Sequence, residues 1–188
     1  MKIMTVAALK GGVGKTTVAV GLAQAMTARG VRVGLLDLDY RNPEVLVALN
    51  ATSVRAGRTT DDALVPPIVG GIAVFSMAMV WPAEKAVLVE DEQAVEDVRQ
   101  LLSPGTIAWP PLDVLICDSP PTSSGISVVA LGAAGLGGAI AVTQPSSLAK
   151  AALLRTLDLF REKQVPVYAV VSNQGVDEDT ASRRYDLP

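Results

Sequence analysis

The chain has 188 residues, enough for one domain with a sizeable hydrophobic core, and it carries a net charge of −3 with a sequence pI of about 5.0. This acidic balance argues against a domain that binds nucleic acid tightly, although it does not exclude a local basic patch. The single cysteine, Cys117, and the lack of histidine exclude an intrachain disulfide and catalysis by histidine. They also leave no basis for a Cys/His zinc site or an iron–sulfur site within this chain.

Neither a targeting segment nor a membrane anchor is expected. The N-terminus runs straight into "KIMTVAA", without an apolar stretch of signal length or a cleavage signal. Nowhere does an uninterrupted apolar run reach the length of about 18 residues that a membrane span needs. We therefore expect a cytoplasmic protein.

Six short apolar runs have the length of β-strands. Most are nearly continuous rather than alternating, which is typical of parallel strands covered on both faces of a sheet. The runs are 2–8, 31–37, 71–76, 113–118, 138–143 and 167–172.

Helical patterns lie between these runs, at 16–29, 91–102 and 147–163. The last helix has Ser146 or Ser147 as a candidate N-cap. We predict a loop with room for one short helix at 50–70, a Pro-rich connection at 103–112 and a polar tail without a clear strand or long helix. The first helix is expected to bury one face, made of Val18, Leu22, Ala25 and Met26.

Alternation of strands and helices predicts an α/β fold, a doubly wound and mainly parallel sheet with helices on both faces. We expect residues 1–188 to form a single domain.

A glycine-rich loop, "KGGVGKTT", joins the first strand to the first helix. Glycines let backbone N–H groups converge on phosphate oxygens, and the helix presents its positive end to the same anion. Lys15 would reach the β- and γ-phosphates and Thr16 would offer its hydroxyl to Mg²⁺; an incidental Gly-rich turn is the alternative. The expected nucleotide contacts are Gly11, Gly12, Val13, Gly14, Lys15, Thr16 and Thr17.

This loop departs from G-x-x-x-x-G-K-[ST], because Leu9 stands where the first glycine should fall and Lys10 follows it. In this it resembles the deviant Walker A loop of the MinD/ParA/Mrp ATPase superfamily, which includes the nitrogenase iron protein. The resemblance implies that Lys10 is the lysine that reaches the nucleotide of the other subunit in a dimer, and so a catalytic residue. A solvated lysine at the end of a strand is the alternative.

Three aspartates follow apolar strands, at the edge where open α/β sheets bind ligands. Asp118, in "VLICDSPP", fits a Walker B residue that holds Mg²⁺ directly or through water, and "DSPP" resembles the second switch of the superfamily. The resemblance makes Asp39 the catalytic residue that orients the attacking water. Asp37 would support the switch or the metal shell. Turn capping is the alternative for all three.

Asn173, in "VVSNQ", resembles the adenine-reading asparagine of the superfamily, and its amide could pair with a donor and an acceptor on the base. A turn-forming asparagine before Gly175 is the alternative.

The Mrp-like branch, the iron–sulfur carrier type, is the most similar over residues 1–176. "LDVLICDSPPTSSG" resembles its "DLPPGTGD" segment, and "AVTQPSSLAK…VPVYAVVSN" resembles its "VTTPQ…VPVLGVVEN" segment. This chain lacks the branch's C-x-x-C pair after the asparagine. Cys117 lies within an apolar strand, which favours a buried structural thiol. We also find no match in this sequence to the branch's last strand and C-terminal helices, or to the amphipathic membrane helix of MinD.

These features together predict a Mg²⁺-dependent ATPase switch that forms a homodimer with ATP between the subunits and turns over slowly until a partner stimulates it. Three downstream roles stay open. They are metallocluster assembly with cysteines supplied from elsewhere, positioning of DNA or another cargo, and a nucleotide-gated interaction module with negligible turnover.

Overall fold

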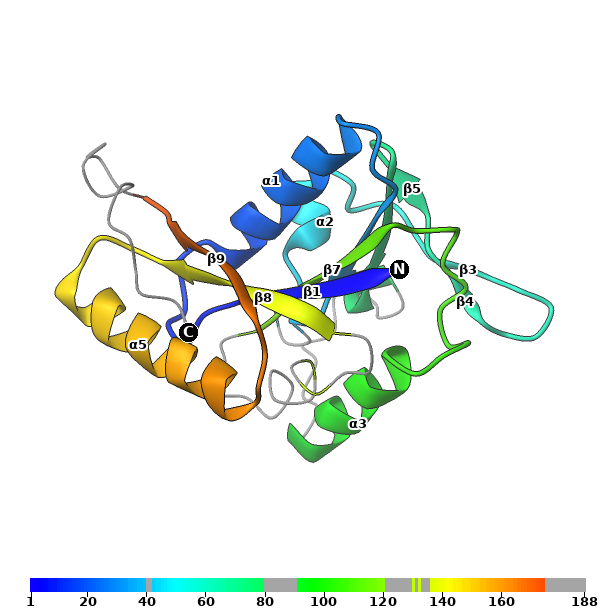
Figure 1. Cartoon of the computed structure of the whole chain (residues 1–188). Helices are drawn as coiled ribbons and strands as arrows, with labels where there is room; N and C mark the ends of the chain where they lie inside the picture. Colours follow the sequence, from blue (N-terminus) through cyan, green and yellow to red (C-terminus); the bar gives the residue numbers. More distant parts are fainter. Residues whose placement is uncertain (40–41, 80–90, 121–129, 131, 133–135, 175–188) are drawn as a thin grey trace.

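A computed structural model describes residues 1–39, 42–79, 91–120, 130, 132 and 136–174 of the chain. The described residues form a central sheet of seven strands in the order β5-β6-β2-β7-β1-β8-β9 (Figure 1). The long strands are β1 (Lys2–Ala7), β2 (Val33–Asp37), β6 (Ile72–Ser76), β7 (Val114–Asp118), β8 (Leu136–Thr143) and β9 (Val167–Ser172).

All six predicted strands are present, with ends that differ by at most two residues from the predicted ones. Every neighbouring pair among these six strands is parallel, as the continuous apolar runs predicted. The seventh strand, β5 (Ile68–Val69), is antiparallel to β6 and forms one edge. The sheet is therefore mainly parallel with one antiparallel edge strand.

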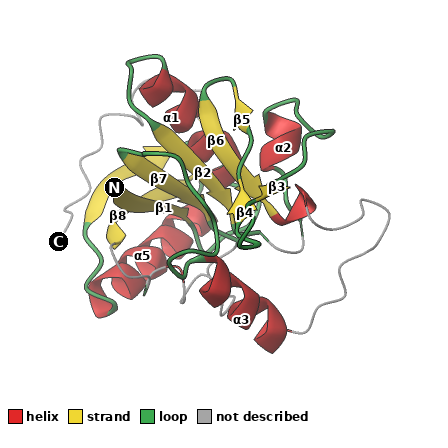
Figure 2. Ribbon diagram, turned by 90° about the vertical axis from the view of Figure 1, so that its right-hand side faces the viewer, coloured by secondary structure: helices red, strands yellow, loops and turns green. Residues whose placement is uncertain are grey.

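Helices cover both faces of the sheet, which confirms the doubly wound α/β prediction. Helix α1 (Lys15–Thr27) lies on one face, whereas α3 (Asp91–Leu101) and α5 (Ser147–Glu162) lie on the other (Figures 1 and 2). The N-cap of α5 is Ser146, whose hydroxyl accepts a hydrogen bond of 3.1 Å from the backbone N–H of Ala149. No helix within the described ranges is long and apolar enough to cross a membrane.

The buried face of α1 differs from the expected one. Ala19, Val20 and Ala23 are buried, whereas Ala25 is exposed. Small side chains let the helix approach the sheet closely, so the bulkier Val18, Leu22 and Met26 flank the contact and are only partly buried. The prediction of the buried face was therefore wrong by a rotation about the helix axis.

The segment 50–70 contains short strands instead of a short helix. These are β3 (Gly57–Arg58), β4 (Leu64–Val65), which pairs with β3 in a separate antiparallel ladder, and β5. The short helix, α2 (Val45–Ala48), lies just before this segment. A 3₁₀ turn, Met77–Met79, follows β6. The polar tail from 175 and the part of the "DSPP" switch segment beyond Pro120 lie outside the described residues.

Candidate functional site

The predicted site residues gather at one edge of the sheet, where β1, β2 and β7 end. In the parallel register, Asp118 of β7 lies opposite Val6 of β1 and Asp37 of β2. The glycine loop leaves β1 directly after Ala7 and enters α1 at Lys15. Strand ends that are far apart in the sequence thus meet beside the loop, as the rule for open α/β sheets predicts.

The loop has the backbone geometry of an anion cradle. Gly12 and Gly14 have φ angles of 73° and 89°, in the left-handed region that favours glycine. Gly14 is also the N-cap of α1, and its carbonyl accepts the first helical hydrogen bond from Val18 at 3.0 Å. Gly11 and Gly12 are exposed, so their backbone N–H groups are accessible to a phosphate at the positive end of the helix.

Lys15 places a cation at the base of this cradle. Its side chain is almost buried, and the loss of water lowers the pKa of its ammonium, although the carboxylates of Asp118, Asp39 and Glu44 oppose that shift. A desolvated ammonium among carboxylates attracts phosphate oxygens more strongly than a solvated one.

Asp118 provides a carboxylate that fits a bound cation. Burial raises its pKa to about 7, while a hydrogen bond from Thr16 and the charge of Lys15 oppose that rise. Its Oδ1 atom is buried and has no hydrogen-bond partner among the described residues. A buried carboxylate oxygen left without a donor suits a hard cation, and Thr16 adds an oxygen ligand beside it. The donor set therefore fits Mg²⁺ held by few protein ligands together with phosphates.

Asp37 supports the segment that follows β2. Its carboxylate is buried and accepts three hydrogen bonds, from the backbone N–H groups of Asp39 (3.1 Å) and Val45 (3.2 Å) and from the Ser76 hydroxyl (3.0 Å). Burial and the nearby charge of Asp118 raise its pKa well above the usual value, and the three donors oppose the rise. It fixes the turn after β2 and the start of α2.

We expect Asp37→Ala to destabilise the fold more than Asp39→Ala. Removing the Asp37 carboxylate leaves two buried donors and one partly buried donor unsatisfied, which costs about 2–4 kcal/mol of unfolding free energy in total. Urea unfolding followed by circular dichroism measures the difference. Equal unfolding midpoints for the two variants would contradict the supporting role of Asp37.

Asp39 lies beyond the end of β2 and is only partly buried. Its Oδ1 accepts a hydrogen bond from the backbone N–H of Asn42 at 3.1 Å, and its charge acts on both Lys15 and Asp118. Glu44 acts on the same two groups, and the sequence analysis missed it. The position of Glu44, five residues after Asp39 and directly before α2, could have indicated that it lies near the site.

Asn173 contacts the phosphate loop itself. Its side-chain amide donates a hydrogen bond of 2.9 Å to the carbonyl of Val13, and its backbone N–H bonds to Thr143 at 2.8 Å. A Cβ atom at position 14 would come too close to this amide nitrogen, so a larger residue would displace the Asn173 side chain, and the positive φ angle of Gly14 also favours glycine. Asn173 therefore braces the loop from the end of β9, a role that the sequence did not suggest.

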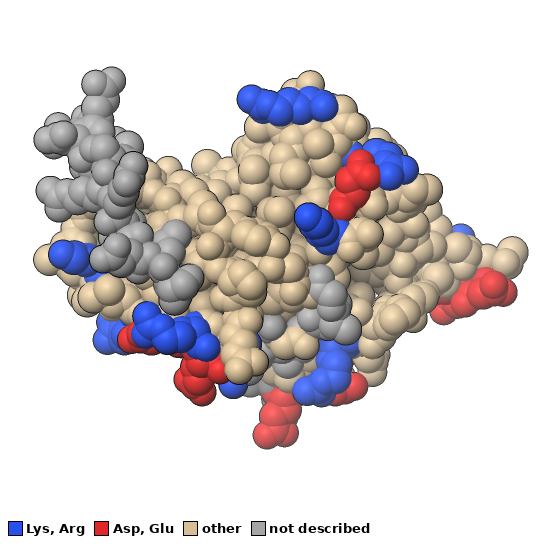
Figure 3. Space-filling model, viewed as in Figure 1, with Lys and Arg blue, Asp and Glu red and all other residues tan. Residues whose placement is uncertain are grey.

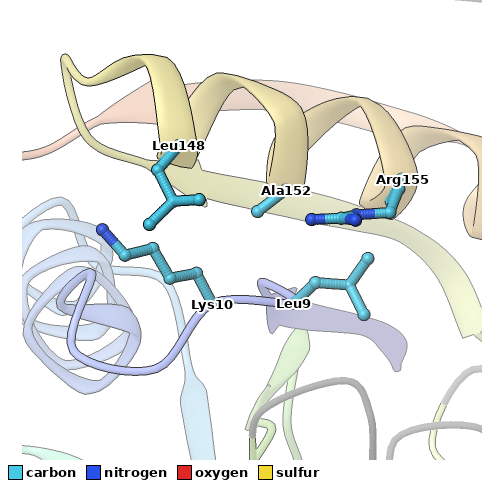
Figure 4. Close-up of a pocket in the computed structure, with 5 residues that line it drawn as sticks. All are labelled: Leu9, Lys10, Leu148, Ala152 and Arg155. Atoms are coloured by element: carbon cyan, nitrogen blue, oxygen red, sulfur yellow. The ribbon is translucent and has the colours of Figure 1, made fainter.

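Lys10 lies outside the cradle, between the loop and α5. A pocket of about 310 Å³ opens there, lined by Leu9, Lys10, Leu148, Ala152 and Arg155 (Figure 4). The Lys10 side chain runs toward Leu148 at the start of α5 (Figure 4). Its ammonium donates a hydrogen bond of 3.3 Å to the side-chain oxygen of Gln144, a residue that the sequence analysis missed. The position of Gln144 directly after β8, at the ligand-binding edge of the sheet, could have indicated that it belongs to the site.

Cys117 is a buried strand residue, as predicted. It is 2% exposed, and burial raises the pKa of its thiol to about 12. We expect it to react with a thiol reagent such as DTNB at pH 8 at least 100-fold more slowly in the folded protein than in denaturant, because both access and thiolate are lacking. Equal rates under the two conditions would contradict this.

Comparison with known protein families identifies the class to which this chain belongs. The family model described as "ParA: NUBPL iron-transfer P-loop NTPase" matches residues 1–183. The chain belongs to this family of P-loop NTPases, within the MinD/ParA/Mrp superfamily that its loop resembles.

Several curated relatives of this chain are named iron–sulfur cluster carrier protein. The one from Deinococcus radiodurans is 35% identical over 171 residues, which cover 91% of this chain and 48% of that protein. The one from Escherichia coli is 31% identical over 174 residues, covering 93% and 47%. The chain thus spans about half the length of these curated relatives.

Solved structures agree on the fold. A nucleotide-binding protein from Archaeoglobus fulgidus, in complex with ADP, superposes with a TM-score of 0.77 at 25% identity, over 98% of this chain and 72% of that one. The septum site-determining protein MinD from Pyrococcus horikoshii, in complex with Mg-ADP, has a TM-score of 0.66 at 18% identity, over 100% and 78%. The second likeness concerns the fold alone.

Proposed function

We propose that this chain is a Mg²⁺-dependent ATPase of the MinD/ParA/Mrp type, a single domain that pairs with a second copy when ATP is bound. The observation that carries the proposal is the buried Oδ1 of Asp118, which has no hydrogen-bond partner among the described residues and lies beside Lys15 and Thr16, next to the exposed Gly11 and Gly12. An arrangement of this kind suits a triphosphate with its metal ion.

In this proposal the loop N–H groups and Lys15 bind the phosphates, while Thr16 and Asp118 hold Mg²⁺. When bound, Mg²⁺ supplies charge neutralisation at the phosphate oxygens. Asp39 accepts a hydrogen bond from the attacking water and aligns it. Phosphoryl transfer depends mainly on alignment and charge stabilisation, so a carboxylate can serve without any histidine. Turnover is slow until a protein partner completes the arrangement.

Base recognition by Asn173 is part of the proposal. One amide hydrogen is directed to Val13, which leaves the amide oxygen to accept from an adenine amino group. Measuring the affinities for ATP and GTP tests whether Asn173 recognises adenine. We expect the parental chain to prefer ATP, and Asn173→Ala to reduce the ratio of the two affinities.

Pairing is proposed because Lys10 extends outside its own cradle, toward α5, where a second subunit's nucleotide could meet it. Sedimentation velocity in Mg-ATP and in Mg-ADP tests pairing, and phosphate release with and without Mg²⁺ tests hydrolysis. We expect dimers in ATP only and hydrolysis only with Mg²⁺. A monomer that binds ATP and never hydrolyses it, even with partners present, would instead fit the nucleotide-gated interaction module.

For the downstream role we favour iron–sulfur cluster handling. Relatives that are 30–35% identical carry the name of cluster carriers, whereas the likeness to MinD is at 18% identity. Basic and acidic side chains of the described residues are interspersed on the face in Figure 3, a distribution that does not favour gripping a nucleic-acid backbone. A positioning role for DNA or another cargo is therefore less well supported.

The cluster would be cargo held by cysteines from outside these 188 residues. The only cysteine here is buried Cys117, and no group of three or more potential metal-binding Cys, Asp or Glu side chains occurs among the described residues. Anaerobic reconstitution with iron and sulfide tests this. We expect cluster absorbance with a cysteine-bearing partner but not with the chain alone, and a cluster on the chain alone would contradict the assignment.

A further inference from the structure

The side chain of Gln144 connects three parts of the site that are far apart in the sequence. Its oxygen accepts the hydrogen bond from the Lys10 ammonium at 3.3 Å. Its amide nitrogen donates to the carbonyl of Gly12 at 3.1 Å and to the side-chain oxygen of Gln174. One neutral amide thus uses its acceptor and both donors on residues of the loop and of the segment after β9.

The backbone explains why residue 144 reaches the loop. Strand β8 lies directly beside β1, with Ala7 opposite Ala141, so the residues that follow the two strands leave the sheet side by side. Gln144 comes one residue after β8 ends at Thr143, as the glycine loop begins after Ala7. Pro145 and the capped start of α5 follow at once and fix the backbone of Gln144.

These contacts leave Lys10 and the loop with a defined shape before any nucleotide binds. Gln144 holds the loop through Gly12, and Asn173 holds it through Val13. An unrestrained lysine side chain has many rotamers, and ordering them on binding costs free energy. A lysine that is already held in place avoids much of that cost.

We propose that Gln144 is a positioning residue that presents Lys10 to the nucleotide of a second subunit and sets the shape of the phosphate loop through Gly12. The inference concerning Lys10 rests on the proposed function. The inference concerning Gly12 does not, because it concerns nucleotide binding by one subunit.

The two contacts can be separated by substitution. Gln144→Ala removes both, whereas Gln144→Glu keeps an acceptor for Lys10 and loses the donor to Gly12. For Gln144→Ala we expect ADP affinity to fall about 2- to 10-fold, the value of one neutral hydrogen bond. We expect kcat for ATP to fall about tenfold as well, through Lys10. Gln144→Glu should recover kcat but not ADP affinity.

A double-mutant cycle with Lys10→Ala distinguishes positioning from a general structural effect. If Gln144 acts on kcat through Lys10, Gln144→Ala should change kcat in the parental chain and leave it unchanged in the Lys10→Ala chain. Gln100→Ala, an exposed glutamine on α3, is the matched control and should change neither quantity. Thermal unfolding midpoints should agree among all variants.

Two results would overturn the inference. One is an equal loss of kcat from Gln144→Ala with and without Lys10, and the other is an unchanged ADP affinity in Gln144→Ala. If the parental chain neither pairs nor hydrolyses ATP, the proposed function fails. In that case, isothermal titration with ADP alone tests the part of the inference that concerns Gln144 and Gly12.

Discussion

Replacing Lys15 with alanine should abolish ATP hydrolysis and weaken nucleotide binding by about 10- to 100-fold. The ammonium is almost buried beside the loop, and a charge-assisted hydrogen bond to phosphate is worth about 1.5–3 kcal/mol. Stabilisation of charge in the transition state adds to this, so kcat/KM should fall by about 1,000-fold or more. Titration calorimetry with ADP and a phosphate-release assay measure the two effects.

The variant should still fold. Asp118 loses its neighbouring cation, but burial already raises the pKa of its carboxyl to about 7, so the group can take up a proton instead of remaining as an isolated buried charge. Lys163→Ala, at an exposed position after α5, is the matched control and should leave both measurements unchanged. ATP binding by Lys15→Ala at the parental affinity would mean that the glycine loop is not the nucleotide site.

Replacing Lys10 with alanine should separate binding from turnover. Lys10 extends toward α5 and bonds to Gln144, so ADP affinity of the single subunit should stay within about threefold of the parental value. ATP-dependent pairing should be lost, and hydrolysis should fall about 100-fold or more, as for removal of one group that stabilises developing charge. Sedimentation velocity in Mg-ATP and single-turnover hydrolysis provide the measurements.

The comparison with Lys15→Ala is informative because the two lysines flank the same glycines. A Lys10→Ala chain that hydrolyses ATP at the parental rate would contradict the cross-subunit role. A Lys10→Ala chain that binds ADP as poorly as Lys15→Ala would indicate that both lysines serve the same subunit's phosphates.

The sheet was predictable because its long strands are buried on both faces. Runs such as 33–37 and 114–118 contain almost only apolar residues, and a turn or a helical pattern bounds each of them. Strands β3, β4 and β5 are two residues long, too short for any periodicity to appear. The β5–β6 hairpin had one local signal, the Gly70–Gly71 pair, and both of these residues have positive φ angles.

The site was predictable where it depends on one strand end and its own loop. Lys15, Thr16 and Asp118 follow from local patterns, and the structure brings them together. The roles of Asn173 and Gln144 depend on which strands are neighbours, because the order β1-β8-β9 alone brings these residues to the loop. Asp37 was ambiguous for the same reason, since Ser76 reaches it only through the pairing of β2 with β6.

The interior position of β1, between β7 and β8, has a consequence for folding during synthesis. Strand β1 leaves the ribosome well before its partners β7 and β8, whose pairing with it begins at Val114 and Leu136. The glycine loop that follows β1 also lacks its hydrogen bonds from Gln144 and Asn173 until those residues have been synthesised. Contacts between such distant segments form late, because the chain between them must first be made and ordered. The glycine loop, although translated before β7, β8 and β9, should thus be among the last of these segments to adopt its nucleotide-binding conformation.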